Sequence, residues 1–195
     1  MPVRGSDSIP PWTESPRMYD IHQHKHSYAI WTASRAWNRK LKGGGLTLAQ
    51  QLIELTGLKD VRGPADIAPD VDAWLLAKMR LIVDYADHNQ IQGINYGRAQ
   101  KLVNIYLKTK LVCGGHETHP NVSQLHPPLD RELFDGLRRV FRKQKTSDAA
   151  VAFAAAQRAC SAWTKFELQD YLAHIDAIKI FMDGQPLWMV EEHWR

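Results

Sequence analysis

The sequence has few cysteines and no long apolar segment, and each absence excludes a class of protein. Two cysteines among 195 residues cannot form a disulfide framework or a four-cysteine iron–sulfur cluster. No apolar run reaches the roughly 18 residues that a membrane-spanning helix needs, and the N-terminal stretch lacks the apolar core of a signal peptide. We therefore expect a cytoplasmic protein that does not contact a membrane.

The composition favours one globular domain with an anionic partner. Hydrophobic residues make up 44% of the chain, which is enough for a core, and the net charge is +4. A basic excess of this kind favours a partner such as nucleic acid. We expect a single, monomeric helical domain over residues 1–195, with possible sub-lobes at about 20–90 and 91–195. The proline-rich residues 1–17 are expected to form an irregular arm.

The hydrophobic periodicity is helical throughout, and no stretch is typical of a β-strand, so the predicted fold class is all-α. Apolar residues at helical spacing predict a core helix over 71–90 and a second helix over 96–112. The glycines and prolines of residues 58–69 indicate a linker. Thr164 and Glu167 have the spacing of a capping box at the start of a later helix.

One stretch combines a glycine turn, a lysine and an aspartate in a distinctive order. Gly93 and Gly97 bracket a tight turn, for which glycine is suited because it tolerates positive φ. Lys101 follows about one turn into the next helix. Asp130 lies 29 positions later, where it can cap the helix that begins after it.

This order resembles the helix-hairpin-helix DNA glycosylases, over about 45 of the 195 residues. In that family the lysine is the amine nucleophile of the bifunctional members, and the aspartate is the shared catalytic carboxylate. The resemblance implies a glycosylase-like helical bundle with a central cleft. The long separation of Lys101 and Asp130 is nearest to the archaeal 8-oxoguanine DNA glycosylase branch. The GxxxG turn departs from the family's compact GxG hairpin.

The resemblance implies an enzyme that cleaves the N-glycosidic bond of a modified base and leaves an abasic site, with possible lyase nicking. A fixed carboxylate can stabilise the positive charge that develops on the sugar, and a neutral lysine amine can form a Schiff base. The expected partner is double-stranded DNA with a flipped modified nucleotide, and no cofactor or metal is expected. The base is either an oxidised purine, as in repair, or a hypermodified cytosine of phage DNA, as in antiviral defence.

The predicted site residues fall into three groups. Lys101 and Asp130 are the catalytic candidates. The candidates for binding DNA phosphate are Gly93, Asn95, Gly97, Arg98, Arg138 and Arg139. The candidates for lining the base pocket are Trp31, Trp37, Asn104, His126 and Trp163.

Three alternatives remain open at the level of sequence, the simplest of which is a helical interaction protein without an enzymatic site. A helix-hairpin-helix module that binds DNA without chemistry would share the glycine turn and the basic run after residue 137. A zinc-dependent enzyme or scaffold would use Cys113, His116 and His119, because thiolate and imidazole ligands suit zinc.

Overall fold

The part of the chain that the structure describes is all-α. The computed structural model describes residues 19–37, 41 and 43–194, so the predicted arm at 1–17 lies outside the described residues. No β-strand occurs within these ranges, which confirms the predicted fold class. The longer helices are α1 (Ile21–Trp37), α2 (Leu46–Leu55), α3 (Val71–His88), α4 (Tyr96–Leu107), α6 (Arg131–Phe141), α7 (Asp148–Ala159) and α8 (Leu168–Met182). The shorter elements are η1 (Leu58–Asp60), η2 (Pro64–Asp66), the π-helix η3 (Lys108–His116), α5 (Pro120–Ser123), η4 (Trp163–Lys165) and η5 (Leu187–His193).

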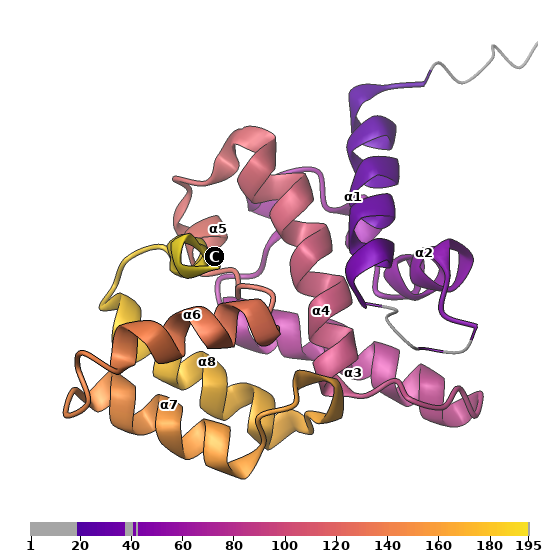
Figure 1. Cartoon of the computed structure of the whole chain (residues 1–195). Helices are drawn as coiled ribbons and strands as arrows, with labels where there is room; N and C mark the ends of the chain where they lie inside the picture. The colour runs from indigo at the N-terminus through magenta and orange to yellow at the C-terminus, as the bar shows by residue number, and fades with distance from the viewer. Residues whose placement is uncertain (1–18, 38–40, 42, 195) are drawn as a thin grey trace, which may run out of the picture.

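Helix α4 lies at the centre of the molecule, between α1 and α3 on one side and α6 to α8 on the other (Figure 1). Every residue from Gly97 to Leu107 is buried. A helix buried all round is normally apolar, yet this one also carries polar side chains. Each of them must find a partner inside the protein, because an unpaired buried polar group is costly. The polar residues are Arg98, Gln100, Lys101 and Asn104.

The predicted linker at 58–69 is instead packed onto the core. Leu58, Val61 and Ile67 are buried. The Lys110 Nζ atom donates a hydrogen bond to the Lys59 carbonyl oxygen at 2.8 Å, and the Asn121 side-chain amide donates to the Ile67 carbonyl oxygen at 3.2 Å. The glycines and prolines of this segment therefore shape η1 and η2 and do not separate two units.

The predicted capping box lies three residues later than the sequence indicated. Helix α8 begins with Glu167 as its N-cap and Asp170 as the reciprocal partner. Thr164 belongs to η4, which packs against α4, so its place is set by tertiary contact and not by the helix that follows.

Nearly all the buried apolar side chains from α1 to η5 belong to one cluster. The predicted division near residue 90 into two sub-lobes stays a prediction. Among the described helices, none is both long and apolar enough to cross a membrane.

Two glycines allow the short 3-10 helices η4 and η5 to lie directly on longer helices. A Cβ atom at Gly97 would lie 1.6 Å from the carbonyl oxygen of Trp163, and one at Gly136 would lie 1.8 Å from that of His193. Only a residue without a side chain permits these approaches. The first contact seats Trp163 against α4, and the second holds the chain beside α6 just before Trp194.

We expect Gly97→Ala to lower the free energy of unfolding by at least about 2 kcal/mol, because the backbone atoms that the new methyl group would meet cannot rotate away. Urea denaturation measures the change. The matched control is Gly63→Ala, at an extended residue with no atom within 4 Å of the new methyl group. It should change stability by less than about 0.5 kcal/mol. Equal midpoints for the two variants would contradict the close contact.

Candidate active site

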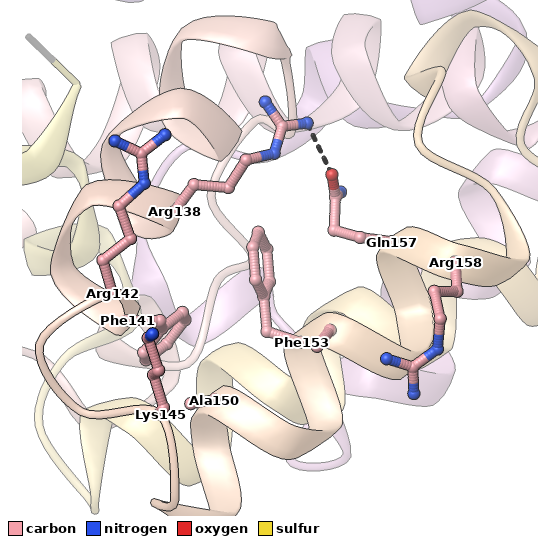
Figure 2. Close-up of a pocket in the computed structure, with 9 residues that line it drawn as sticks. Arg138, Phe141, Arg142, Lys145, Ala150, Phe153, Gln157 and Arg158 are labelled. Carbon is pink, nitrogen blue, oxygen red and sulfur yellow. Dashed lines mark hydrogen bonds between the residues drawn. The ribbon is translucent and has the colours of Figure 1, made fainter.

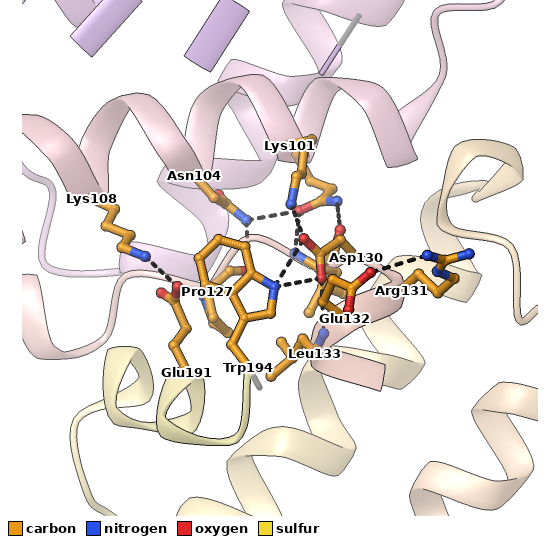
Figure 3. A network of polar contacts seen from close by, with 12 residues as sticks. Lys101, Asn104, Lys108, Pro127, Asp130, Arg131, Glu132, Leu133, Glu191 and Trp194 are labelled. Carbon is orange, nitrogen blue, oxygen red and sulfur yellow. Dashed lines mark hydrogen bonds and ion pairs between the residues drawn. The ribbon is translucent and has the colours of Figure 1, made fainter. Parts of the chain in front are cut away.

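The site is organised by an ion pair between α4 and the start of α6. The Lys101 Nζ atom lies 2.6 Å from Asp130 Oδ2. The other carboxylate oxygen, Oδ1, accepts the backbone N–H of Leu133 at 2.9 Å and so caps α6, as the sequence predicted. Figure 3 shows the two side chains pointing toward each other across the gap between their elements. The structure therefore brings together the two predicted catalytic residues.

Two tryptophans flank the Lys101 amine. Its Nζ atom lies 5.7 Å from the centre of the Trp163 ring and 5.6 Å from that of Trp194. The Trp194 indole N–H also donates to Asp130 Oδ1 at 3.0 Å. Together these groups line a pocket of about 360 Å³. Its lining residues are Arg35, Ala36, Lys101, Asp130, Arg131, Glu132, Trp163 and Trp194.

Burial sets the ionisation of the lysine amine. Only 3% of the Lys101 side chain is exposed, and the loss of hydration lowers its pKa. The Asp130 carboxylate opposes this shift, because it favours the charged form, but burial is the larger effect. The outcome is an amine that is easier to deprotonate than an exposed lysine, although it lies next to a carboxylate.

A second, partly buried ion pair lies further along the chain, where α4 continues into η3. Lys108 pairs with Glu191 of η5 (Figure 3), and the Lys108 Nζ atom lies 4.9 Å from the centre of the Trp194 ring. Burial raises the pKa of Glu191, and the nearby Lys108 opposes that shift. Trp194 thus has an ammonium group of α4 and one of η3 within 6 Å of its ring.

Gln100 fixes the backbone next to Asp130. Its side-chain amide donates to the Leu129 carbonyl oxygen at 2.9 Å and accepts the Leu129 N–H at 3.0 Å. Two consecutive residues of α4, Gln100 and Lys101, therefore hold two consecutive residues of the facing loop. This clamp keeps the carboxylate within reach of the amine.

Asn104 and His126 lie behind the site and do not line its pocket, which corrects the prediction for both. The Asn104 amide donates to the Pro127 carbonyl oxygen and to the Tyr171 hydroxyl, each at 3.2 Å. His126 is buried, with its ring nitrogens 2.6 Å from the Tyr171 hydroxyl and 2.9 Å from Asp72. The hydrogen bond from His126 lowers the pKa of Asp72, and burial lowers the pKa of His126. Both predicted residues instead anchor the loop that carries Asp130.

Trp37 and Arg98 are also placed differently from the prediction. Trp37 is fully buried in the core, and its carbonyl oxygen accepts a hydrogen bond from Arg98 Nη1 at 2.6 Å. The Arg98 guanidinium therefore points inward, where burial lowers its pKa, and it does not face a DNA backbone. Trp163 does line the pocket, whereas Trp31 lies outside it on α1.

Two of the predicted hairpin residues, Asn95 and Gly97, make hydrogen bonds within the protein. Asn95 caps α4 by accepting the Arg98 N–H at 3.2 Å, and its amide donates to the Thr164 carbonyl oxygen. The Gly97 N–H donates to the Phe166 carbonyl oxygen at 3.2 Å. These N–H groups are bonded within the protein, and contact of Asn95 or Gly97 with phosphate stays a prediction. Gly93 is exposed with φ +84°, and its contact with phosphate stays a prediction.

Arg138 and Arg139 point to different faces of α6. Arg138 bonds to Asp135 and Gln157 and lines a hollow of about 400 Å³ between α6 and α7, where Figure 2 shows its guanidinium. Arg139 lines a separate hollow beside Gly136 and His193. Contact of either side chain with DNA stays a prediction.

The residues of the zinc alternative are not gathered into a site. Cys113 and His116 lie in η3, whereas His119 caps α5 by accepting the Asn121 N–H at 3.2 Å. Across residues 19–37, 41 and 43–194, no group of three or more histidine, cysteine or acidic side chains is arranged to hold a metal ion.

Comparison of the chain with protein families, curated proteins and solved structures finds no match.

The residues of the site that lie outside the predicted groups include Arg35, Gln100, Glu191 and Trp194. Gln100 had a signal, because it is a polar residue beside Lys101 on a helix of apolar pattern. The other three come from α1 and the C-terminal segment, far from Lys101 in the chain. No local pattern connects them with it.

We expect Gln100→Met to lower the free energy of unfolding by about 2 kcal/mol or more, because it leaves the buried N–H and carbonyl groups of Leu129 without partners. Gln50→Met is the control, since Gln50 is exposed and its side chain bonds to the exposed Glu54. Chemical denaturation compares the two variants. A loss for Gln100→Met no larger than that of the control would argue against the clamp.

Proposed function

We propose that the protein is a DNA glycosylase in which Lys101 and Asp130 are the catalytic residues. The observation that supports this function most directly is the 2.6 Å ion pair of a buried amine and a carboxylate in a pocket between two tryptophans. The resemblance to helix-hairpin-helix glycosylases implies this pair of groups. A purely structural ion pair would not require a flanking pocket.

The order of the elements supports the same proposal. Helix α3 ends at His88, the turn contains Gly93 with positive φ, and α4 then carries Lys101. Asp130 stands at the N-cap of the helix that faces α4. This arrangement is the one that the sequence resemblance implies, with a turn longer than the family's GxG hairpin.

The chemistry begins with cleavage of the bond between C1′ and the base. The bonding electrons leave with the base, which takes up a proton from solvent water, and Asp130 stabilises the positive charge on the sugar. The neutral Lys101 amine forms a new bond to C1′. Asp130 is close enough to accept the proton that the amine loses. Opening of the sugar ring gives a Schiff base, and β-elimination then breaks the 3′ phosphate ester. If water attacks in place of the amine, the product is an abasic site.

The lowered pKa of Lys101 suits this role, because only the neutral amine is a nucleophile. The rings of Trp163 and Trp194 offer surfaces against which an extruded base can stack. Arg35 and Arg131 also line the pocket and supply positive charge for the flanking phosphates.

The target in this proposal is a modified base, either an oxidised purine or a hypermodified cytosine. A hollow beside the pocket is consistent with a target base larger than the normal four. Lys108, next to Trp194, also lines a hollow of about 520 Å³ between η3 and η5, together with Glu117 and Trp188. The chain between Lys101 and Asp130, which is long in this protein, forms one wall of that hollow.

We expect Asp130→Asn to reduce base release by about 10²- to 10³-fold, because it removes the charge that stabilises the sugar cation. Release is measured by alkaline cleavage of three DNAs: an unmodified plasmid, a duplex with 8-oxoguanine, and phage DNA with hypermodified cytosine. DNA binding should be retained. Asp135→Asn, on the same helix but paired with Arg138 outside the pocket, should keep its activity.

The substrate panel separates the versions of the proposal. Release from one modified DNA only identifies the base, whereas equal release from all three contradicts the preference for a modified base. DNA binding with no release from any substrate favours a non-catalytic helix-hairpin-helix protein.

We expect Lys101→Gln to abolish covalent trapping of the protein on DNA by borohydride, whereas Lys59→Gln, at an exposed lysine of η1, should trap normally. Trapping by the natural protein should rise with pH and level off below the pKa of a free lysine, about 10.4, because burial lowers the pKa of Lys101. Trp194→Ala lets water reach the Lys101 amine and so weakens the effect of burial on its pKa. In this variant the rise of trapping with pH should therefore shift to higher pH. Trp188→Ala removes an indole that does not contact Lys101 and should leave the profile unchanged.

Trapping that persists in Lys101→Gln would place the nucleophile elsewhere. If no trapping occurs in the natural protein although base release does, water is the nucleophile and Lys101 acts through Asp130.

A further inference from the structure

Helix α1 carries exposed aromatic rings along one face. Tyr28 is 55% exposed and Trp31 is 47% exposed, although large aromatic rings are normally buried in part or in full. The two rings are stacked, with centroids 5.8 Å apart and planes at 23°. The Arg35 guanidinium carbon lies 5.1 Å from the centre of the Trp31 ring. Spacings of three and four place the three side chains on the same face.

The same face continues toward the N-terminal end of α1. His24 lies four residues before Tyr28, and its ring meets that of Tyr19 edge-to-face at 5.9 Å. The Tyr19 hydroxyl is 3.1 Å from His24 Nδ1. From His24 to Arg35 the face spans about 16 Å, at ~1.5 Å per residue. We call the four side chains His24, Tyr28, Trp31 and Arg35 the α1 stripe.

Two further features connect the α1 stripe with the active site. Helix α1 has no acidic residue, whereas it carries Lys25, Arg35 and three histidines. At its inner end, Arg35 lines the pocket that holds Lys101 and Asp130. The stripe is therefore a non-acidic row of rings that leads out of the pocket and over the surface.

We propose that the α1 stripe binds unpaired nucleotides of the strand whose target base enters the pocket, by stacking their bases on its rings. The inference rests on the proposed function for the identity of the polymer. Aromatic rings interleaved with cations are the usual means of holding single strands, since every base has a π-face to stack. The absence of carboxylates on α1 avoids repulsion of the phosphates.

Base pairing decides which form of DNA can use the stripe. In a duplex the faces of the bases are covered by their neighbours, so they cannot stack on Tyr28 or Trp31. The stripe therefore favours a single-stranded or locally opened substrate, with the unpaired nucleotides next to the target. A paired duplex reaches the pocket only by extruding one nucleotide and gains little from α1.

The test compares binding of an unmodified single strand with binding of the corresponding duplex, by fluorescence anisotropy. The double variant Tyr28→Ala with Trp31→Ala should bind the single strand at least about 10-fold more weakly and the duplex within about 2-fold of the natural protein. The double phenylalanine variant should restore binding. Leu81→Ala, which removes an exposed apolar side chain of α3, should change neither affinity.

The same unmodified DNAs separate this inference from the proposed function. Single-strand binding unchanged in the alanine variant overturns the role of the stripe, whether or not the protein releases bases. Weaker single-strand binding without any base release supports the stripe while the proposed chemistry fails.

Two further measurements guard against indirect effects. If the alanine variant is less stable, Trp31→Phe alone provides the test: a single strand should quench less tryptophan fluorescence in this variant than in the natural protein. Equal quenching would count against stacking. Loss of self-association with no change in DNA affinity would show that the face binds another protein copy, and would overturn the proposal.

Discussion

The Asp130 carboxylate is the point on which the site depends, because it accepts hydrogen bonds from three separate parts of the chain. Lys101 donates from α4, the Leu133 N–H from α6, and the Trp194 indole from the C-terminal segment. The carboxylate provides each donor with an acceptor: a buried ammonium, a backbone N–H in the first turn of a helix, and an indole N–H. One carboxylate therefore joins elements that are distant in sequence, and its position is determined by all three.

The burial of Lys101 explains why the loop that carries Asp130 is held by so many hydrogen bonds. Removing an amine from water disfavours its charged form, and the neighbouring carboxylate compensates only in part. The pKa of Lys101 is therefore lowered. Such a balance persists only if the carboxylate cannot move away. The Gln100 clamp on Leu129 and the anchoring of Pro127 by Asn104 hold the loop on the side opposite the pocket. The polar side chains of α4 thus support the pair of Lys101 and Asp130.

Backbone contacts at two glycines help to position the two tryptophans, in addition to the packing of Trp163 on the core and the hydrogen bond from Trp194 to Asp130. Gly97 admits the backbone of η4, and Gly136 admits the end of η5. Because neither glycine has positive φ, the reason for glycine here is space alone. Indole rings held in this way stay at the pocket edge, where Trp194 remains 39% exposed. On the other side of the pocket, Arg35 connects the site with the rings of α1.

Local sequence determined the helical class, the core helix over α3, the turn with Gly93, and the capping role of Asp130, since periodicity, glycine conformation and helix capping act over a few residues. With the resemblance to a family, it also indicated that Lys101 and Asp130 belong together. It could not place Trp37, Arg98, Asn104 or His126, which are buried, because a polar or aromatic residue on a helix has the same local pattern whether it faces a pocket or the core.

Only the tertiary structure decided the remaining features. Trp194, Glu191 and Arg35 reach the site from opposite ends of the chain, and Gln100 faces Leu129 because α4 and the loop before α6 pack together. The depressed pKa of Lys101 also arises only when the chain closes over it. The physical reason is the same in each case: burial and long-range contact depend on how the elements pack, and short stretches of sequence carry no information about distant partners.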